Sequence, residues 1–479
     1  MNMPAAKGRL LLLGVIGLSG CAPLPATSPP QPEIARPALQ QTLAAVAGDP
    51  AFELVAQANR AWWHAFDDKA LDALVDAALL GNPSLTTAQA RIERARQAAH
   101  LVELESGVRY DSEASVVRQH LSENGLFPPP MGGSTLNEGD ISAAAAYTFD
   151  WWGKNRSLLQ SALGESRAAE AERSAAELAL TGEVADAYFN WQDVAARAKL
   201  ARQMVDKRRM AMRLAQLRLK RGIDAALVSS QMEVLLVQEQ DSLKDLEMQS
   251  RILRNRLAAL AGNGPDWAAR LEEPELSSAG PFPLPQKLPL DWLAQRPDLV
   301  ALKWRVETAA SRIDGAKADF YPNVDMRLLL GLQSIDLGNW LTAKNWYGSV
   351  GPAVHIPLFN VNTLRSNLGV RQTEYAAAAA QYNQALVTAA SQVADALARV
   401  SSLDARERLQ HGATASADHS QHLQAARFAS GLSDRLPLLD EETAALAQHA
   451  RESRLQADRR RAMAALFLAL GGGYKSNQE

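Results

Sequence analysis

Residues 154–221 read KNRSLLQSALGESRAAEAERSAAELALTGEVADAYFNWQDVAARAKLARQMVDKRRMAMRLAQLRLKR, and this stretch decides the fold. It holds two glycines, Gly164 and Gly182, and no proline. It therefore predicts one continuous helix, which at 1.5 Å per residue would extend about 100 Å. Ordinary globular helices average about 11 to 12 residues. A helix this long needs a tubular or coiled-coil context to bury its apolar side chains.

The sequence around this helix alternates between two periods. A turn is predicted at Gly222-Ile223-Asp224, and a second helical pattern then returns to Gly262. Before the long helix, apolar residues alternate with polar ones in 108–116 and 141–149, which is the period-two pattern of strands. Two shorter helices precede these strands, and Asn82-Pro83 separates them.

The same order of elements appears a second time, about 210 residues later. Arg156 matches Arg365, and the pattern Arg218-x-x-x-Gly222 matches Arg427-x-x-x-Gly431, each pair 209 positions apart. The chain is therefore predicted to be an internal duplication. The predicted parts are a signal peptide (1–20), a lipidated N-terminal tether (21–60), repeat 1 (61–275) and repeat 2 (290–473). The second repeat holds a helix to Phe320, strands at 324–332 and 350–358, and helices at 363–430 and from Gly431 to Gly471.

The four predicted strands are about 9 to 11 residues long, enough to cross a bilayer when tilted. Four strands cannot close a barrel, and an open strand edge is not tolerated in lipid. Several copies must therefore contribute: two would give eight strands, and three would give twelve, with room for a wet channel. The long helices are expected to continue such a barrel as a coaxial tube. The predicted fold class is mainly α with a membrane β part.

Tryptophans flank the predicted strands. Trp151, Trp152, Trp340 and Trp346 stand where a membrane-interface aromatic girdle belongs. The alternative is that these side chains pack within turns.

The N-terminus reads as a secretory signal. Arg9 precedes the apolar run 10–18, which is too short to span a bilayer, and Leu18-Ser19-Gly20-Cys21 closes it. This ending resembles a bacterial lipobox, which implies cleavage before Cys21 and a covalent lipid on its thiol. Ala22 follows where an aspartate would favour the inner membrane, so the outer membrane is expected. The alternative is an ordinary signal peptide with a chance cysteine.

Composition excludes several classes of protein. The net charge of −3 argues against a nucleic-acid binder. Cys21 is the only cysteine, so neither a disulfide nor a thiolate metal site is expected. After the signal no run of about 20 apolar residues occurs, which predicts no membrane-spanning helix. Catalytic and nucleotide-binding motifs are missing, so we expect no enzyme and no cofactor other than the lipid.

Several motifs together resemble one family. They are Trp63 with Leu71-Asp72-x-Leu74-Val75, Ala88-x-Ala90-Arg91-Ile92, Asp150-x-Trp152-Gly153-Lys154-x-Arg156, Arg296-Pro297-Asp298-Leu299, Ala316-x-Ala318-x-Phe320-Tyr321-Pro322, Ile356-Pro357-Leu358-Phe359-Asn360 and Leu470-Gly471-Gly472-Gly473-Tyr474. The chain resembles the TolC/OprM family of outer membrane factors, in its lipoprotein multidrug-efflux branch. The resemblance implies a homotrimer with a 12-stranded outer-membrane β-barrel on a coaxial 12-helix periplasmic α-barrel. Such a trimer is a passive conduit that exports drugs or other small toxic molecules. It docks onto a periplasmic adaptor and an inner-membrane transporter.

The resemblance also implies roles for the turns between the long helices. Adaptor-contact candidates at the two tips are Arg218, Gly222, Asp224, Arg427, Gly431 and Asp434. Gate candidates follow the second tip: Leu439 as a hydrophobic constriction, and Asp440, Glu441 and Glu442 as a carboxylate ring. An acidic first helical turn favoured by the helix dipole explains these carboxylates equally well. Thr443 stands near the place where many family members carry an arginine, so a salt-bridge lock is left open.

Other interpretations remain. A lipid-anchored periplasmic adaptor without a pore is the main alternative function, and a coiled-coil lipoprotein without a channel is another. His419 and His422 could hold a metal ion, although a solvated helix face explains them better, and no metal site is predicted. The charge runs 207–209 and 458–461 are interpreted as solvated faces, with adaptor contact or tunnel lining as the alternative.

Overall fold

The computed structural model describes residues 61–274 and 293–473. It also describes residues 33–35, 37–38, 41–42, 44 and 48–55, and the backbone of 282–285. Cys21, the predicted lipidation site, and Tyr474 lie outside these residues. Within them, every helix falls short of the length and hydropathy needed to cross a membrane.

The described chain forms two compact units. The first contains Arg91–Ala169 and Leu302–Tyr382, and the second contains Ile34–Ala90, Glu170–Ala301 and the chain from Asn383 onward. Both repeats contribute to both units, because the long helices pass from one unit into the other. The division therefore follows layers of structure and not the duplication.

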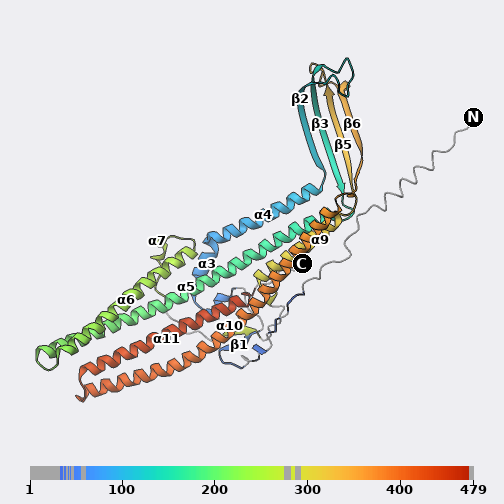
Figure 1. Ribbon diagram of the computed structural model, residues 1–479. Coiled ribbons are helices and arrows are strands. Elements are labelled where there is room, and N and C mark those ends of the chain that lie inside the picture. Colours follow the sequence, from blue (N-terminus) through green and yellow to red (C-terminus); the bar gives the residue numbers. More distant parts are fainter. Residues whose placement is uncertain are drawn as a thin grey trace, which may run out of the picture. The chain divides into compact units, whose positions relative to one another are not determined.

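The first unit contains a four-stranded antiparallel sheet (Figure 1). The strands are β2 (Arg109–His120), β3 (Thr135–Phe149), β5 (Asn323–Ser334) and β6 (Trp346–His355), in the order β2-β3-β5-β6. The central pair joins the two repeats, with Gly139 opposite Ser334 and Phe149 opposite Val324. Strands β2 and β6 are the two edges of this sheet.

Helices enter and leave the sheet at one end. They are α4 (Pro83–Ser106), α5 (Lys154–Lys220), α9 (Pro297–Ala318) and α10 (Val361–Ala429). Asp150 starts α5, because its carboxylate accepts backbone N–H bonds from Asn155 and Arg156. Phe320 is fully buried beside Ala316 and Leu368, where the end of α9 meets the start of α10.

The second unit is built from two long helical hairpins. In the first hairpin α6 (Ala226–Leu260) returns along α5, and in the second α11 (Arg435–Ala469) returns along α10 (Figure 1). Cross-helix bonds confirm each pairing: Trp191 Nε1 donates to Ser250 Oγ at 3.1 Å, and Gln410 Nε2 donates to Gln448 Oε1 at 2.9 Å. The remaining elements of this unit are η2 (Trp62–Phe66), α3 (Lys69–Gly81), α7 (Pro265–Ala268), β1 (Phe52–Val55) and β4 (Phe282–Pro285).

Aromatic side chains form much of this unit's core. Trp62 is 1% exposed and its ring lies 5.4 Å from that of Phe467. Phe66 lies 4.8 Å from the buried ring of Phe189, measured between ring centroids. These contacts hold η2 against α5 and α11. Burying large aromatic surfaces supplies much of the stabilisation that long polar helices lack.

The two repeats close their hairpins in the same way. Asn82 Nδ2 donates to the carbonyl of Leu260 at 2.7 Å, at the end of α6. Arg296 Nη1 donates to the carbonyl of Ala469 at 3.1 Å, at the end of α11. Both residues precede a proline that starts a helix. Each therefore satisfies a helix-terminal carbonyl that has no partner within its own helix.

The N-terminal segment contacts the second repeat. The Ala35 N–H donates to Asn383 Oδ1 at 2.9 Å, and the Ser401 hydroxyl donates to Asp49, which lowers the pKa of that carboxyl. Strand β1 pairs in parallel with β4. The described part of the predicted tether is thus bound along α10, a feature that composition did not indicate.

The fold-class prediction is confirmed: the chain is mainly helical, with four strands in one sheet. The strand boundaries differ. Strand β6 begins at Trp346 and ends at His355, earlier than the predicted 350–358. The sequence pattern continues to Leu358, but Pro357 cannot donate to a strand ladder. The β1–β4 pair was not predicted, because two four-residue strands far apart in sequence give no periodic signal.

Candidate functional site: the two hairpin tips

The two tips share one backbone design. Gly222 and Gly431 adopt φ of +68° and +73°, a conformation that glycine reaches without strain. In each turn the residue after this glycine bonds back to the arginine four positions before the glycine. The Ile223 N–H donates to the Arg218 carbonyl, and the Leu432 N–H donates to the Arg427 carbonyl, both at 2.9 Å. The predicted repeat register is therefore also the structural one at the tips.

At the first tip Arg218 is saturated with carboxylates. Its guanidinium donates in a fork to Asp224, from Nε at 2.7 Å and from Nη2 at 3.0 Å. Its remaining Nη1 donates to Asp434 of the second tip. The bond from Arg218 holds the pKa of Asp224 below its ordinary value. Arg218 thus joins the two turns to each other.

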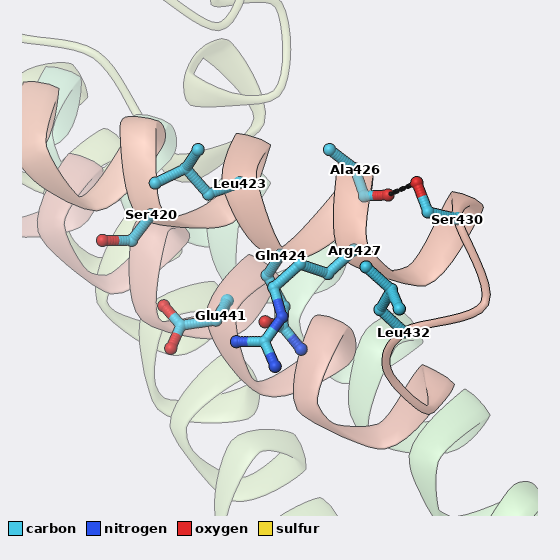
Figure 2. A pocket seen from close by; sticks show the side chains of 8 residues that line it. All are labelled: Ser420, Leu423, Gln424, Ala426, Arg427, Ser430, Leu432 and Glu441. Atoms are coloured by element: carbon cyan, nitrogen blue, oxygen red, sulfur yellow. Dashed lines mark hydrogen bonds between the residues drawn. The ribbon is translucent and has the colours of Figure 1, made fainter.

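At the second tip the corresponding charges differ. Asp434 is the N-cap of α11, and its carboxylate accepts the Arg435 N–H. Ser433 occupies the position that Asp224 has in the first turn, and it accepts a bond from Gln424 Nε2 at 2.6 Å. Arg427 lines an open groove of about 520 Å³ between α10 and α11 (Figure 2).

The predicted gate residues lie on the first turns of α11. Leu439 is 2% exposed, and the Thr443 hydroxyl donates to its carbonyl at 2.8 Å. Asp440 accepts a bond from Arg208 Nη1 at 2.7 Å, and Glu442 forms an ion pair with Lys207 Nζ at 2.7 Å. Glu441, between them, lines the groove with Arg427. Near the tips, three ion pairs therefore join the first hairpin to the second. Farther along the same helices a fourth pair, Arg461–Asp186 at 2.8 Å, joins them with the charges reversed.

The sequence did not indicate which cations pair with the gate carboxylates. Lys207 and Arg208 belong to a charge run that was interpreted as a solvated face, whereas their side chains are only 29% and 15% exposed. The family resemblance left a salt-bridge lock open near Thr443, on the same helix as the acids. The signal that could have found the partners is charge sign near the tips: residues 207–221 of the first hairpin carry seven cations and no acid, and residues 434–442 of the second carry four acids.

The four singled-out tryptophans lie at the two ends of the sheet. Trp152 stacks on Tyr321 at 4.4 Å and donates to the Pro322 carbonyl, and Trp151 is two-thirds exposed beside Phe149. At the other end, Trp340 donates to the Leu332 carbonyl and Trp346 is 68% exposed. Trp152 and Trp340 thus have the bonds of packed turns, whereas Trp151 and Trp346 are largely exposed, and the aromatic girdle stays a prediction.

Two histidines of the second hairpin pair with carboxylates. His411 pairs with Glu452 and His449 with Asp418, each at 3.0 Å across α10 and α11. His419 and His422 are exposed on α10. Among the residues that the structure describes, no three His, Cys, Asp or Glu side chains are grouped to hold a metal ion.

A buried polar network connects α3, α5 and α11. Asp68 caps α3 and accepts bonds from the Tyr188 hydroxyl and from Gln192 Nε2, while Arg460 donates to Gln192 Oε1 at 2.9 Å. Burial raises the pKa of Tyr188 and lowers the pKa of Arg460. The network fixes the short helix α3 on both hairpins, and sequence reasoning missed it.

A duplicated chain with four long strands and two helical hairpins has the architecture of an outer-membrane channel. The profile of the outer membrane efflux protein family matches residues 74–263 and 288–472. The chain belongs to this family.

Relatives and solved structures agree with this assignment. The multidrug resistance outer membrane protein MdtQ of Escherichia coli O6:H1 is 30% identical over 471 residues, covering 96% of each chain. The fusaric acid resistance protein FusA of Burkholderia cepacia is 32% identical over 381 residues, 77% of this chain and 70% of that protein. The outer membrane protein VceC of Vibrio cholerae is 30% identical, with a TM-score of 0.77 over 87% of this chain and 100% of that one. The outer-membrane channel OprN, 24% identical with a TM-score of 0.81, shares the fold.

The protein is an outer-membrane channel component of multidrug efflux, which confirms the main functional prediction and its location. The adaptor alternative is not supported. The family is one of channel proteins and not of enzymes.

Proposed function

We propose that three copies of this chain form a passive duct for drugs or other small toxic molecules. An inner-membrane transporter supplies the energy, and a periplasmic adaptor connects that transporter to the duct. The relatives named for multidrug resistance and for fusaric acid resistance support this class of cargo.

The observation that carries the proposal is the open sheet. Edges β2 and β6 have no strand partner among the described residues, and apolar side chains are exposed on all four strands. An open edge facing lipid leaves backbone groups unsatisfied, so the sheet must close with further copies. Three copies give twelve strands, enough for a wet lumen.

Strand length supports a bilayer-crossing role. The register of β3 with β5 runs over the eleven residues from Gly139 to Phe149. Their ten steps of about 3.3 Å extend about 33 Å. A tilt of about 40° reduces this to about 25 Å, the height of an outer-membrane apolar band. Trp151 is exposed just beyond one end of this span, and Trp346, whose partner Leu332 lies opposite Ile141, is exposed near the other end. These are places that suit interface anchors.

The ion pairs at the second hairpin support a closed resting state. Moving α11 away from α5 breaks Arg208–Asp440, Lys207–Glu442 and Arg218–Asp434 together. We infer that opening is a two-state displacement of the second hairpin, which adaptor binding favours by compensating for these contacts. The carboxylates of Asp440 and Glu441, which keep exposed surface, would line the constriction, whereas Leu439 is buried and would support it from behind.

The lipid anchor is proposed on the sequence alone. Cys21 follows a lipobox-like ending, and a lipid there would hold the chain at the outer membrane. Mass spectrometry of the mature N-terminus tests it: a diacylated cysteine supports the anchor, and an unmodified Cys21 contradicts it.

Electrophoresis and planar-bilayer recording test the proposed duct. A heat-modifiable trimer that carries ionic current is expected. A protein that stays monomeric and water-soluble without detergent, or a trimer that carries no current in any variant, would contradict the duct.

A further inference from the structure

The duplication allows the two tips to be compared residue by residue. With the offset of 209, Arg218 corresponds to Arg427 and Gly222 to Gly431. By the same offset Asp224 corresponds to Ser433, and Ala225 corresponds to Asp434. The arginine is therefore kept in both tips, while each of its carboxylate partners is present in only one.

This exchange leaves Arg427 without either of the two carboxylates that bind Arg218. Arg218 has Asp224 from its own hairpin and Asp434 from the other hairpin. Arg427 faces Ser433 in place of the first of these, and among the described residues it forms no ion pair. In a closed ring of alternating hairpins, a neighbouring copy would offer Ala225 at the second position. Neither of the two positions that bind Arg218 therefore offers Arg427 an acid.

The surroundings of Arg427 are shaped to receive a side chain. Figure 2 shows its guanidinium directed into the groove between α10 and α11, with Glu441 on the facing helix. Leu423 and Leu432 give this groove apolar walls. Within the described residues Arg427 and Glu441 form no ion pair with each other. A groove with an arginine at one place and a carboxylate at another is complementary to a segment that carries both charges.

We propose that this second-tip groove is the docking site for an acidic side chain of the periplasmic adaptor, which pairs with Arg427. The inference rests on the proposed function, and it adds which residue receives the partner and what chemistry the partner presents. It also predicts three such sites in a trimer and not six, because Arg218 is already saturated at every first tip.

Docking there reaches the gate directly. Glu441 lies between Asp440 and Glu442, whose carboxylates hold the ion pairs to Arg208 and Lys207. A partner seated in the groove therefore touches the same helical turn that joins the two hairpins. Binding at Arg427 and release of those ion pairs become linked events.

The test measures adaptor affinity for tip variants. Trimers in lipid nanodiscs are titrated with a purified adaptor that restores drug efflux together with this chain in cells. We expect Arg427→Glu to weaken the affinity at least about tenfold, as reversal of an interfacial charge does. The matched control is Arg221→Glu, the same charge change on an exposed arginine of the first tip, which should stay within about twofold. Arg427→Lys should retain most of the affinity.

A charge swap identifies the partner group. Acidic residues of the adaptor's tip are changed to arginine one at a time, and one of them should restore binding to Arg427→Glu. Affinity for the wild-type trimer should fall with added salt, and this dependence should lessen in Arg427→Gln.

The outcomes separate this inference from the proposed function. Equal affinities for Arg427→Glu and Arg221→Glu would overturn the docking assignment while leaving the duct intact. Arg427→Gln and Glu441→Gln could instead change conductance equally without changing affinity. Arg427 would then pair with Glu441 internally, and the assignment would again be overturned. Conducting wild-type trimers that bind no adaptor would remove the tripartite function and this inference together.

Discussion

The first and second hairpins share a backbone and differ in charge. Both turns use a glycine with positive φ, and both returning helices end on a bond from the residue before a proline. Yet the first hairpin carries the cations Lys207, Arg208 and Arg218, and the second carries their three acidic partners. Near the tips, the two copies therefore kept the geometry while their charges became complementary. Farther from the tips the polarity is reversed, because Arg461 of the second hairpin pairs with Asp186 of the first.

This difference makes the two interfaces of a hairpin ring unequal. By the offset of 209, Arg208 and Asp440 correspond to Ala417 and Gln231, and Lys207 and Glu442 correspond to Ser416 and Glu233. Neither corresponding pair has opposite charges. We therefore expect these ion pairs between the two hairpins of one chain and not between hairpins of neighbouring chains. In a ring of six hairpins, every second interface would then be held by ion pairs.

The largest expected effect concerns the hydrogen bond that closes the hairpin in each repeat. Arg296→Ala removes the donor to the Ala469 carbonyl, a bond to Gln392 and the pair with Asp298. We expect the free energy of unfolding to fall by about 2 to 3 kcal/mol, because a helix-terminal carbonyl and a carboxylate lose their partner. Asn82→Ala, the counterpart in repeat 1, should cost about 1 kcal/mol. Thermal dissociation of the trimer measures both, and equal midpoints for the two variants would contradict the ranking.

A charge reversal breaks the complementarity between the hairpins. Lys207→Glu with Arg208→Glu turns two attractions into repulsions. The free energy that favours the closed state over the open one should fall by about 1 to 2 kcal/mol. Conductance in planar bilayers should rise by about tenfold, since 1.4 kcal/mol is a factor of ten. Adding Asp440→Arg and Glu442→Lys should restore low conductance.

The control for this reversal is Arg209→Glu, in the same charge run. Arg209 pairs with Asp206 on its own helix and does not reach the second hairpin. A rise in conductance for Arg209→Glu equal to that of the double variant would show that net charge, and not pairing, sets closure.

Two aspartate substitutions would give the two tips the same charges. Ala225→Asp with Ser433→Asp gives Arg427 the two carboxylates that Arg218 has. We expect fewer channel openings. We also expect helix α6 to be stabilised by about 1 kcal/mol, because an aspartate at position 225 can cap the helix and the side chain of Ala225 cannot. Ala225→Ser, which caps without charge, separates the two effects. Unchanged opening in the double aspartate variant would argue against a role for tip charges.

The smallest expected effect is a pH dependence at the tips. The pKa of Asp224 lies below its ordinary value because Arg218 bonds to its charged form. A depressed pKa stabilises the folded tip above the ordinary aspartate value of about 3.9, and this contribution disappears as pH falls through the lowered pKa. Conductance should therefore rise slightly below about pH 4. Asp224→Asn should remove that part of the response.

Most of the helices and all four long strands were predictable from local periodicity. The helix over 154–221 ends at Lys220, one residue from its predicted limit, because glycine- and proline-free sequence leaves the backbone no competing conformation. The duplication was readable for the same reason, since turn glycines and arginines recur at one spacing. These features depend on neighbours in sequence, which a single chain displays in full.

Tertiary structure alone decided which charges meet. Arg208 and Asp440 are 232 positions apart, and Arg218 and Asp434 are 216 apart. No periodicity relates such positions, because their distance depends on how two hairpins pack and not on either helix. The same reason explains Asn82 with Leu260, Arg296 with Ala469, and the parallel pair β1–β4. The sequence by itself determined the elements and their repeat, whereas packing determined the pairs that hold the hairpins together.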